Sequence, residues 1–248
     1  MTPYYSDTHV EIYLGDCRDV LPTLDDASFD HVITDPPYSA NVHKRVRSSN
    51  KNSMPDAHEF GCRTRRQVDL GFEPLSPPLR RFCAREFARL AKRWVMAFSD
   101  VEMCHLWRLS LGAAGLDYCR TMEWRRLNGA PQFTGDRPAS SFEAITLAHQ
   151  PGKKRWNGGG KQGVYEHPIV MNRGGNTPRR HTTPKPLLLM SQLVCDFSDP
   201  SNTILDPFMG SGTTLRAAKD AGRKAVGVEL SEAYCESAAK WMAQEVLF

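Results

Sequence analysis

The chain has 248 residues, 40% of them hydrophobic, and a formal net charge of +4. That length can bury one sizeable core, so one domain with insertions is expected. No apolar run approaches the roughly 18 residues that span a bilayer, and the first residues lack the basic and apolar segments of a signal peptide. The sequence therefore predicts a cytoplasmic protein. Its seven cysteines contain no C-x-x-C pair, which argues against a disulfide framework and a structural zinc site.

Five short apolar runs are predicted to be buried strands, because most of them end in an acid and none alternates like a half-exposed strand. They cover residues 10–16, 29–35, 93–100, 202–208 and 224–230. Helical patterns cover residues 76–93, 101–115, 184–198, 213–222 and 231–245. Strands alternating with helices predict a doubly wound, mostly parallel α/β sheet.

Two segments, residues 39–75 and 125–180, do not fit this rhythm and are expected to be insertions at the carboxyl edge of the sheet. Each contains a polar and basic stretch, at 43–66 and 152–180. Such stretches are typical of loops that face an anion, and ordinary solvated surface is the alternative interpretation.

The strand at 29–35 runs into the tetrapeptide Asp35-Pro36-Pro37-Tyr38. Two consecutive prolines end a strand and make a rigid corner, which here carries an acid and an aromatic ring. By itself this pattern also fits a capped turn with a core tyrosine.

A glycine turn, "DPFMGSGTT" at residues 206–214, joins a predicted strand to a predicted helix. Glycines let the backbone approach a ligand, and the exposed amides of the helix suit an anionic group. Glu229 ends the following strand, where it can accept hydrogen bonds from ribose hydroxyls. The dinucleotide fingerprint fails at Leu215, and Asp206 suggests a ligand with a cationic end. S-adenosylmethionine fits all of these features, whereas a turn that only packs helix on strand is the alternative.

Together these motifs make the chain resemble the amino-group DNA methyltransferases, which methylate adenine N6 or cytosine N4. The resemblance is carried by "DPPY" at 35–38, "DPFMGSGTT" at 206–214, "HTTPKPLLLM" at 181–190 and "YLGDC" at 13–17. The catalytic motif comes first and the cofactor motif last, an order similar to the permuted beta group. The resemblance implies one catalytic domain over 1–248 with a Rossmann-like S-adenosylmethionine-dependent methyltransferase fold.

The resemblance also implies roles for individual residues. Asp35 and the carbonyl of Pro36 would accept hydrogen bonds from the target amino group, with Pro37 completing the corner, and Tyr38 would stack on the flipped base. The implied cofactor-binding residues are Asp16, Cys17, Thr183, Lys185, Asp206, Phe208, Gly210, Ser211, Gly212, Thr213, Glu229 and Leu230.

Double-stranded DNA is the implied partner, with residues 39–75 as a mobile DNA-contacting loop and 125–180 as an inserted target-recognition region. Candidate DNA contacts are His43, Lys44, Arg45, Arg47, Arg125, Arg137, Lys153, Arg155, Lys161 and Arg179. Phosphate contacts position a protein on DNA, whereas a few side chains read bases.

The expected activity is methylation of adenine N6, because an acid at the first position of the catalytic motif is more typical of adenine enzymes in this family. Cytosine N4 methylation is the nearest alternative, and a non-catalytic nucleic-acid-binding module is a more remote one. A homodimer and a partner restriction enzyme are both compatible with the sequence, as is a solitary methylase.

Overall fold

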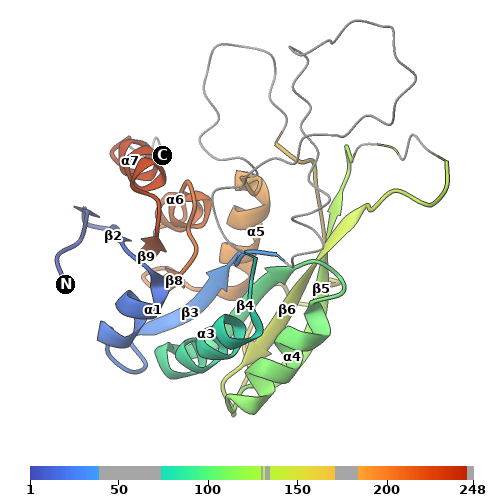
Figure 1. Ribbon diagram of the computed structural model, residues 1–248, viewed down its shortest axis with the longest axis horizontal. Coiled ribbons are helices and arrows are strands. Elements are labelled where there is room, and N and C mark those ends of the chain that lie inside the picture. The colour runs from blue at the N-terminus through green and yellow to red at the C-terminus, as the bar shows by residue number, and fades with distance from the viewer. Residues whose placement is uncertain (39–73, 130, 132–134, 171–183, 245–248) are drawn as a thin grey trace, which may run out of the picture.

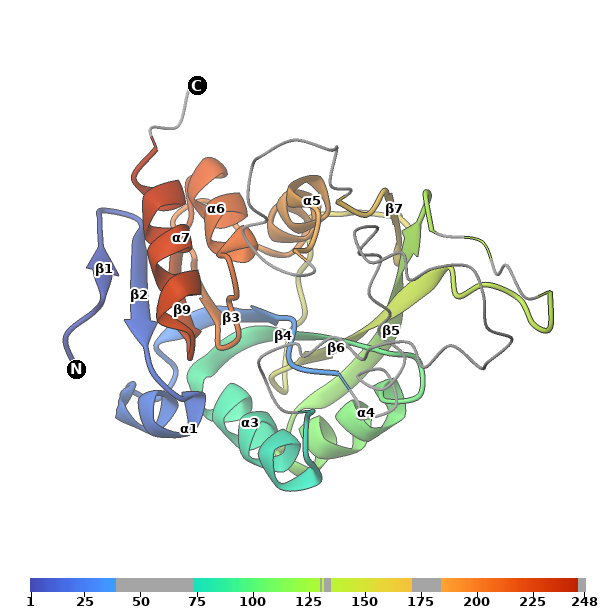
Figure 2. The ribbon, with the colours of Figure 1, turned by 45° about the horizontal axis from the view of Figure 1, so that its top comes forward.

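The computed structural model describes residues 1–38, 74–129, 131, 135–170 and 184–244. Within these ranges, nine strands form one sheet in the order β1-β2-β9-β8-β3-β4-β6-β5-β7. Figure 1 labels the central strands of this sheet, and Figure 2 also labels the edge strands β1 and β7. The strands are β1 Tyr5–Ser6, β2 Val10–Leu14, β3 Phe29–Thr34, β4 Ala91–Ser99, β5 Asp117–Arg126, β6 Phe142–His149, β7 Val164–His167, β8 Thr203–Asp206 and β9 Lys224–Glu229. The helices are α1 Cys17–Val20, a 3-10 turn η1 Leu21–Thr23, α3 Pro77–Leu90, α4 Cys104–Ala113, α5 Leu187–Phe197, α6 Thr213–Asp220 and α7 Glu232–Met242.

The sheet is mostly parallel, as predicted. Strands β2, β9, β8, β3 and β4 all run in one direction. Strand β6 is antiparallel to both of its neighbours, β4 and β5, so β5 and the edge strand β7 again follow the direction of β4. The five predicted strands and five predicted helices are all present, with bounds that differ by a few residues.

The range 125–180 needs a correction, because part of it belongs to the sheet. Strand β6 lies between β4 and β5, and its residues from Ala144 to His149 are buried. Strand β7 adds Tyr165, which is also buried. A target-recognition role for the remainder of this range stays a prediction. The predicted mobile loop at 39–75 falls almost wholly outside the described residues.

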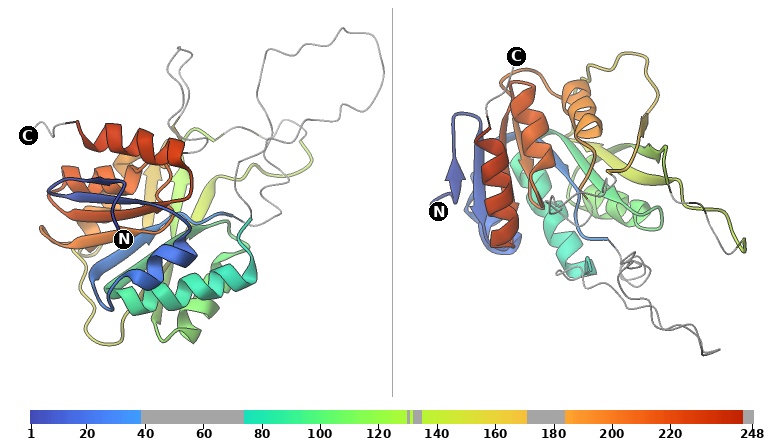
Figure 3. Two further views of the ribbon diagram at one scale, coloured as in Figure 1. Left: turned by 60° about the vertical axis from the view of Figure 1, so that its left-hand side comes forward. Right: turned by 90° about the horizontal axis from the view of Figure 1, so that it is seen from above.

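Helices cover both faces of the sheet, which is the doubly wound arrangement (Figures 2 and 3). Helices α5, α6 and α7 bury one cluster of apolar side chains, and α1, α3 and α4 bury a second cluster on the opposite face. Helix α3 illustrates the local cause: Ser76 caps its first turn, where two prolines are tolerated. Its inward face then buries Phe87 and Leu90 completely, and burying each such side chain contributes about 1.5–3 kcal/mol. A search of the described residues for a helix that could span a membrane finds none.

The carboxyl ends of β9, β8 and β3 are neighbours at one edge of the sheet. The antiparallel strand β6 brings its first residues to this same edge and its last residue to the opposite one. The segment after β6 therefore lies at the amino edge, where the Gln150 side chain donates to the carbonyls of Ala88 and Ala91 at 2.5 and 2.8 Å. The expectation that all of 125–180 lies at the carboxyl edge is thus wrong for residues 150–161.

Candidate active site

Asp35 lies directly after β3, at the carboxyl edge of the sheet, and its side chain is 28% exposed. Its Oδ2 atom accepts a hydrogen bond from Lys185 Nζ at 2.5 Å. Its Oδ1 atom is buried and has no hydrogen-bond partner among the described residues. Buried acceptors are nearly always paired, so an unpaired one at a rigid corner is an acceptor suited to a ligand.

Lys185 lies between Pro184 and Pro186, just before α5, and its side chain is 10% exposed. Besides Asp35, its ammonium donates to the Tyr38 hydroxyl at 3.0 Å and lies 3.2 Å from Glu143 Oε2. The same ammonium lies 5.1 Å from the ring centre of Phe98, within cation–π range. The lysine therefore joins the corner to two other elements; its implied contact with the cofactor stays a prediction.

Glu143, near the start of β6, is a residue that sequence reasoning missed. It is 16% exposed, and its Oε2 atom accepts a hydrogen bond from the Tyr38 hydroxyl at 2.5 Å. The only local signal is an acid inside the apolar run "FEAITLAH". That signal says the acid is buried and does not say which residues it meets.

The pKa values at the corner reflect burial and charge together. Burial raises the pKa of Asp35, and the nearby Glu143 carboxylate raises it further, against the opposing effect of Lys185. Burial also acts to raise the pKa of Glu143, but Lys185, the Tyr38 hydroxyl and Arg126 outweigh it, so that pKa is lowered. Glu143 is consequently the more firmly ionised of the two carboxyl groups.

Three more features lie at the neighbouring strand ends: Asp206, the turn from Gly210 to Gly212, and Glu229. Asp206 ends β8 and accepts from Thr34 Oγ1 at 2.8 Å, and burial raises its pKa to about 6. Gly210 and Gly212 have φ values of 52° and 82°, which favour glycine. The Gly210 amide donates to Glu229 Oε2 at 3.0 Å, and burial raises the Glu229 pKa despite such amide bonds.

The other predicted cofactor residues lie around this turn. Asp16 is next to Glu229 across the sheet, since the Gly15 amide donates to the Glu229 carbonyl at 2.9 Å. The Asp16 carboxylate caps α1 and pairs with Arg18 at 2.5 Å. Cys17, Ser211 and Thr213 are buried, Phe208 is partly buried, and Leu230 is 64% exposed. Thr183 lies outside the described residues.

The candidate DNA contacts divide between the two edges of the sheet. Arg125, at the end of β5, pairs with Glu123 and Glu166, and Arg137 pairs with its neighbour Asp136. Three further candidates lie beyond β6 at the amino edge, away from Asp35: Lys153, Arg155, which pairs with Asp199 at 3.2 Å, and Lys161, which pairs with Asp196 at 2.8 Å. The remaining candidates, His43, Lys44, Arg45, Arg47 and Arg179, fall outside the described residues.

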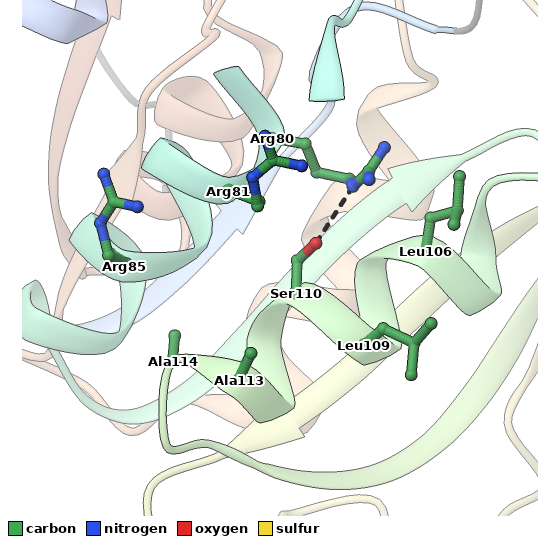
Figure 4. A pocket seen from close by; sticks show the side chains of 8 residues that line it. All are labelled: Arg80, Arg81, Arg85, Leu106, Leu109, Ser110, Ala113 and Ala114. Atoms are coloured by element: carbon green, nitrogen blue, oxygen red, sulfur yellow. Dashed lines mark hydrogen bonds between the residues drawn. The ribbon is translucent and has the colours of Figure 1, made fainter. Parts of the chain in front are cut away.

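A cavity of about 330 Å³ lies between α3 and α4, apart from this corner (Figure 4). Three arginines of α3 and apolar residues of α4 line it, and Arg80 Nε donates to Ser110 Oγ at 3.1 Å. It contains none of the residues at the carboxyl edge, so the candidate active site is the corner at Asp35 together with the glycine turn.

Comparison with known proteins identifies the family of this chain. The sequence model of the DNA methylase family matches residues 29–240, a span that includes Asp35, Glu143, Lys185 and the glycine turn. The chain belongs to the DNA methylase family.

Relatives of this methylase include the type II methyltransferase M.HinfI of Haemophilus influenzae, which is 23% identical over 92% of this chain and 67% of its own length. Among solved structures, the M1.HpyAVI–SAM complex has a TM-score of 0.68 at 22% identity and covers 95% of this chain and 100% of its own. The cytosine-N4-specific PvuII DNA methyltransferase has a TM-score of 0.70 at 14% identity, covering 99% and 90%. The predicted methyltransferase fold is confirmed.

Proposed function

We propose that this methylase transfers a methyl group from S-adenosylmethionine to the N6 amino group of an adenine flipped out of double-stranded DNA. The observation that carries the proposal is Asp35 Oδ1, a buried acceptor without a described partner at a rigid proline corner. It lies beside the glycine turn, where strands β8 and β9 end in Asp206 and Glu229.

The chemistry at the corner follows from the nature of an aromatic amine. Its lone pair is delocalised into the ring, so the amine is a poor nucleophile. Asp35 Oδ1 and the Pro36 carbonyl would accept its two hydrogens and draw them out of the ring plane, which localises the lone pair on nitrogen. Such catalysis relies on positioning and on charge placement. Asp35 can take the proton that the amine loses after transfer.

The cofactor proposal rests on how the turn fits its parts. The Asp206 carboxylate would hold the ammonium group, the amides of the Gly210–Gly212 turn would meet the carboxylate, and Glu229 would accept from the ribose hydroxyls. When bound, S-adenosylmethionine supplies an electrophilic methyl group on a sulfonium. The solved structure of M1.HpyAVI with this molecule, at a TM-score of 0.68, supports the proposal.

Adenine is proposed over cytosine because the first residue of the motif is the acid Asp35. The likeness to a cytosine-N4-specific enzyme at a TM-score of 0.70 means that the fold is common to both chemistries. Nucleoside analysis of DNA from cells that express this protein tests the choice. N6-methyladenine is expected, and N4-methylcytosine alone would overturn the adenine assignment.

A base inside a duplex must be flipped to reach the corner, and an aromatic face compensates for its lost stacking. Tyr38 is proposed for that role. The DNA would approach the carboxyl edge, on the side of Arg125 and Arg137. A cytoplasmic location, a homodimer and a cognate restriction enzyme stay predictions from the sequence.

A further inference from the structure

We infer that Glu143 is a positioning residue, which orients Tyr38 and shares Lys185 with Asp35 so that the corner is ready to receive the target base. The inference rests on the proposed methyl transfer at Asp35. Glu143 acts on Asp35 through Lys185 and Tyr38, which it contacts, and through its own negative charge.

The geometry is a cluster of four side chains from three separate segments, in which Lys185 contacts each of the other three. Lys185 Nζ reaches Asp35 at 2.5 Å, the Tyr38 hydroxyl at 3.0 Å and Glu143 at 3.2 Å. The Tyr38 hydroxyl in turn donates to Glu143 at 2.5 Å. Because the hydroxyl has one proton and gives it to Glu143, it can only accept from Lys185. The direction of both bonds is therefore set, and the Tyr38 ring is held at its far end.

Electrostatics give Glu143 a second effect on the corner. The Lys185 ammonium lies between two carboxylates, so neither of them has it alone. Two carboxylates and one ammonium leave a local charge of −1 when both acids are ionised. That charge favours the positive charge that builds up on the amine nitrogen as it is methylated. Without Glu143, Lys185 would pair with Asp35 alone and weaken it as an acceptor.

Among the described residues, few other charged groups lie around this cluster of four side chains. Asp206 faces Asp35 from the end of β8, and it is an acid, so it does not compete with Lys185 as a cation. Arg126 of β5 faces Glu143, with its Nη1 atom 3.7 Å from Oε1. Among the described residues, Lys185 is the only cation within 4.0 Å of the Asp35 carboxylate, so sharing it with Glu143 changes how strongly it pairs with Asp35.

The test is Glu143→Gln, assayed from pH 5 upward with labelled S-adenosylmethionine and unmethylated bacterial genomic DNA. Loss of one anchored group should lower kcat by about 10- to 100-fold, with KM values close to those of the wild type. Since Glu143 raises the pKa of Asp35, the neutral variant should lose activity only at a lower pH than the wild type. An unchanged kcat with an unchanged acid limb would overturn the inference.

Two further variants separate positioning from folding. Tyr38→Phe removes only the hydroxyl, which lowers the pKa of Asp35, so this variant should have a lower kcat and an acid limb that does not shift to lower pH. Glu143→Asp keeps the charge but shortens the side chain, so it should also lower kcat with the acid limb in place. If Glu143→Gln does not fold, these two decide, and wild-type kcat in both would reject the inference.

Glu236→Gln is the matched control, since Glu236 is an exposed glutamate of α7 paired with Lys240. It should behave as wild type, and calorimetry should show S-adenosylmethionine binding to every folded variant. A wild-type protein that methylates neither adenine nor cytosine would reject the proposed function itself, which is a different result from a normal wild type with an insensitive Glu143.

Discussion

At the scale of single residues, the corner is defined by which oxygen atoms have partners. Lys185 occupies one oxygen of Asp35 and leaves the other free among the described residues. A carboxylate arranged in this way is held in place and can still accept a hydrogen bond. The sequence identified Asp35 and Tyr38 as a pair, whereas their connection through Lys185 and Glu143 depends on residues 105 and 150 positions away.

Replacing Asp35 should separate catalysis from cofactor binding. Asp35→Ala removes the proposed acceptor, and we expect kcat to fall by about 10²–10³-fold or more. Lys185 keeps Glu143 as a partner in the variant, so the fold should persist. Labelled-methyl transfer and calorimetric titration with S-adenosylmethionine measure the two properties. Loss of cofactor binding together with folding would contradict the assigned role.

Asp206 should make stability depend on pH in an unusual direction. Its pKa rises from 3.8 in the unfolded chain to about 6 in the fold, so the folded state binds the extra proton between these values. Its contribution to stability is therefore present below pH 3.8 and is lost as the pH rises through 6, by about 3 kcal/mol in total.

Comparing the wild type with Asp206→Asn in urea unfolding from pH 4 to 7 isolates this contribution. The wild type should lose stability relative to the variant as the pH rises. A difference that stays constant over this range would show that Asp206 does not titrate there.

At the scale of elements, the glycine turn depends on close contact between α6 and α7. A Cβ atom added at Gly212 would lie 3.1 Å from Ala238 Cβ and 3.3 Å from Met242 Cε. Position 212 thus needs glycine for two reasons: its positive φ and the close approach of α7. With a side chain at position 212, Ala238 and Met242 of α7 would have to shift by a few tenths of an ångström.

Gly212→Ala should consequently cost more than its backbone conformation alone. Gly222 is a matched control, because its φ of 71° is similar and nothing lies within 4 Å of an added Cβ. Gly222→Ala should cost about 1–2 kcal/mol, whereas Gly212→Ala should cost more and weaken S-adenosylmethionine binding. Equal losses in urea unfolding, with unchanged affinity, would argue against the contact with α7.

At the scale of the whole molecule, the described candidate DNA contacts lie in two groups, at opposite edges of the sheet. Arg137 belongs to the β5–β6 connection at the carboxyl edge, and Lys153 lies beyond β6 at the amino edge. DNA whose flipped base reaches Asp35 would approach the first group. The structure thereby places at opposite edges two groups of candidates that were named together from the sequence.

DNA affinity measured against salt concentration tests this division. Log affinity should fall linearly with log salt concentration, and Arg137→Ala should reduce the slope by about one. Lys153→Ala should leave both affinity and slope close to wild type. A larger effect at Lys153 than at Arg137 would show that DNA reaches the amino edge instead.

The sequence by itself determined the features that depend on neighbouring residues. Apolar runs that end in an acid predicted β3, β8 and β9, and the glycine turn and the proline corner were recognisable because their chemistry lies within a few positions. These strands are parallel neighbours, so their ends, with Asp35, Asp206 and Glu229, meet at one edge.

Only the tertiary structure decided what depends on chain direction. Strand β5, "DYCRTMEWRR", has a polar sequence because one of its faces is partly exposed. Strand β6 lies between β4 and β5 and is buried over most of its length. Because β6 runs antiparallel, it carries Glu143 to the corner and the basic segment from Lys153 to Lys161 to the far edge. No local pattern records the direction of a strand, since a strand's side-chain alternation is the same whichever way it runs.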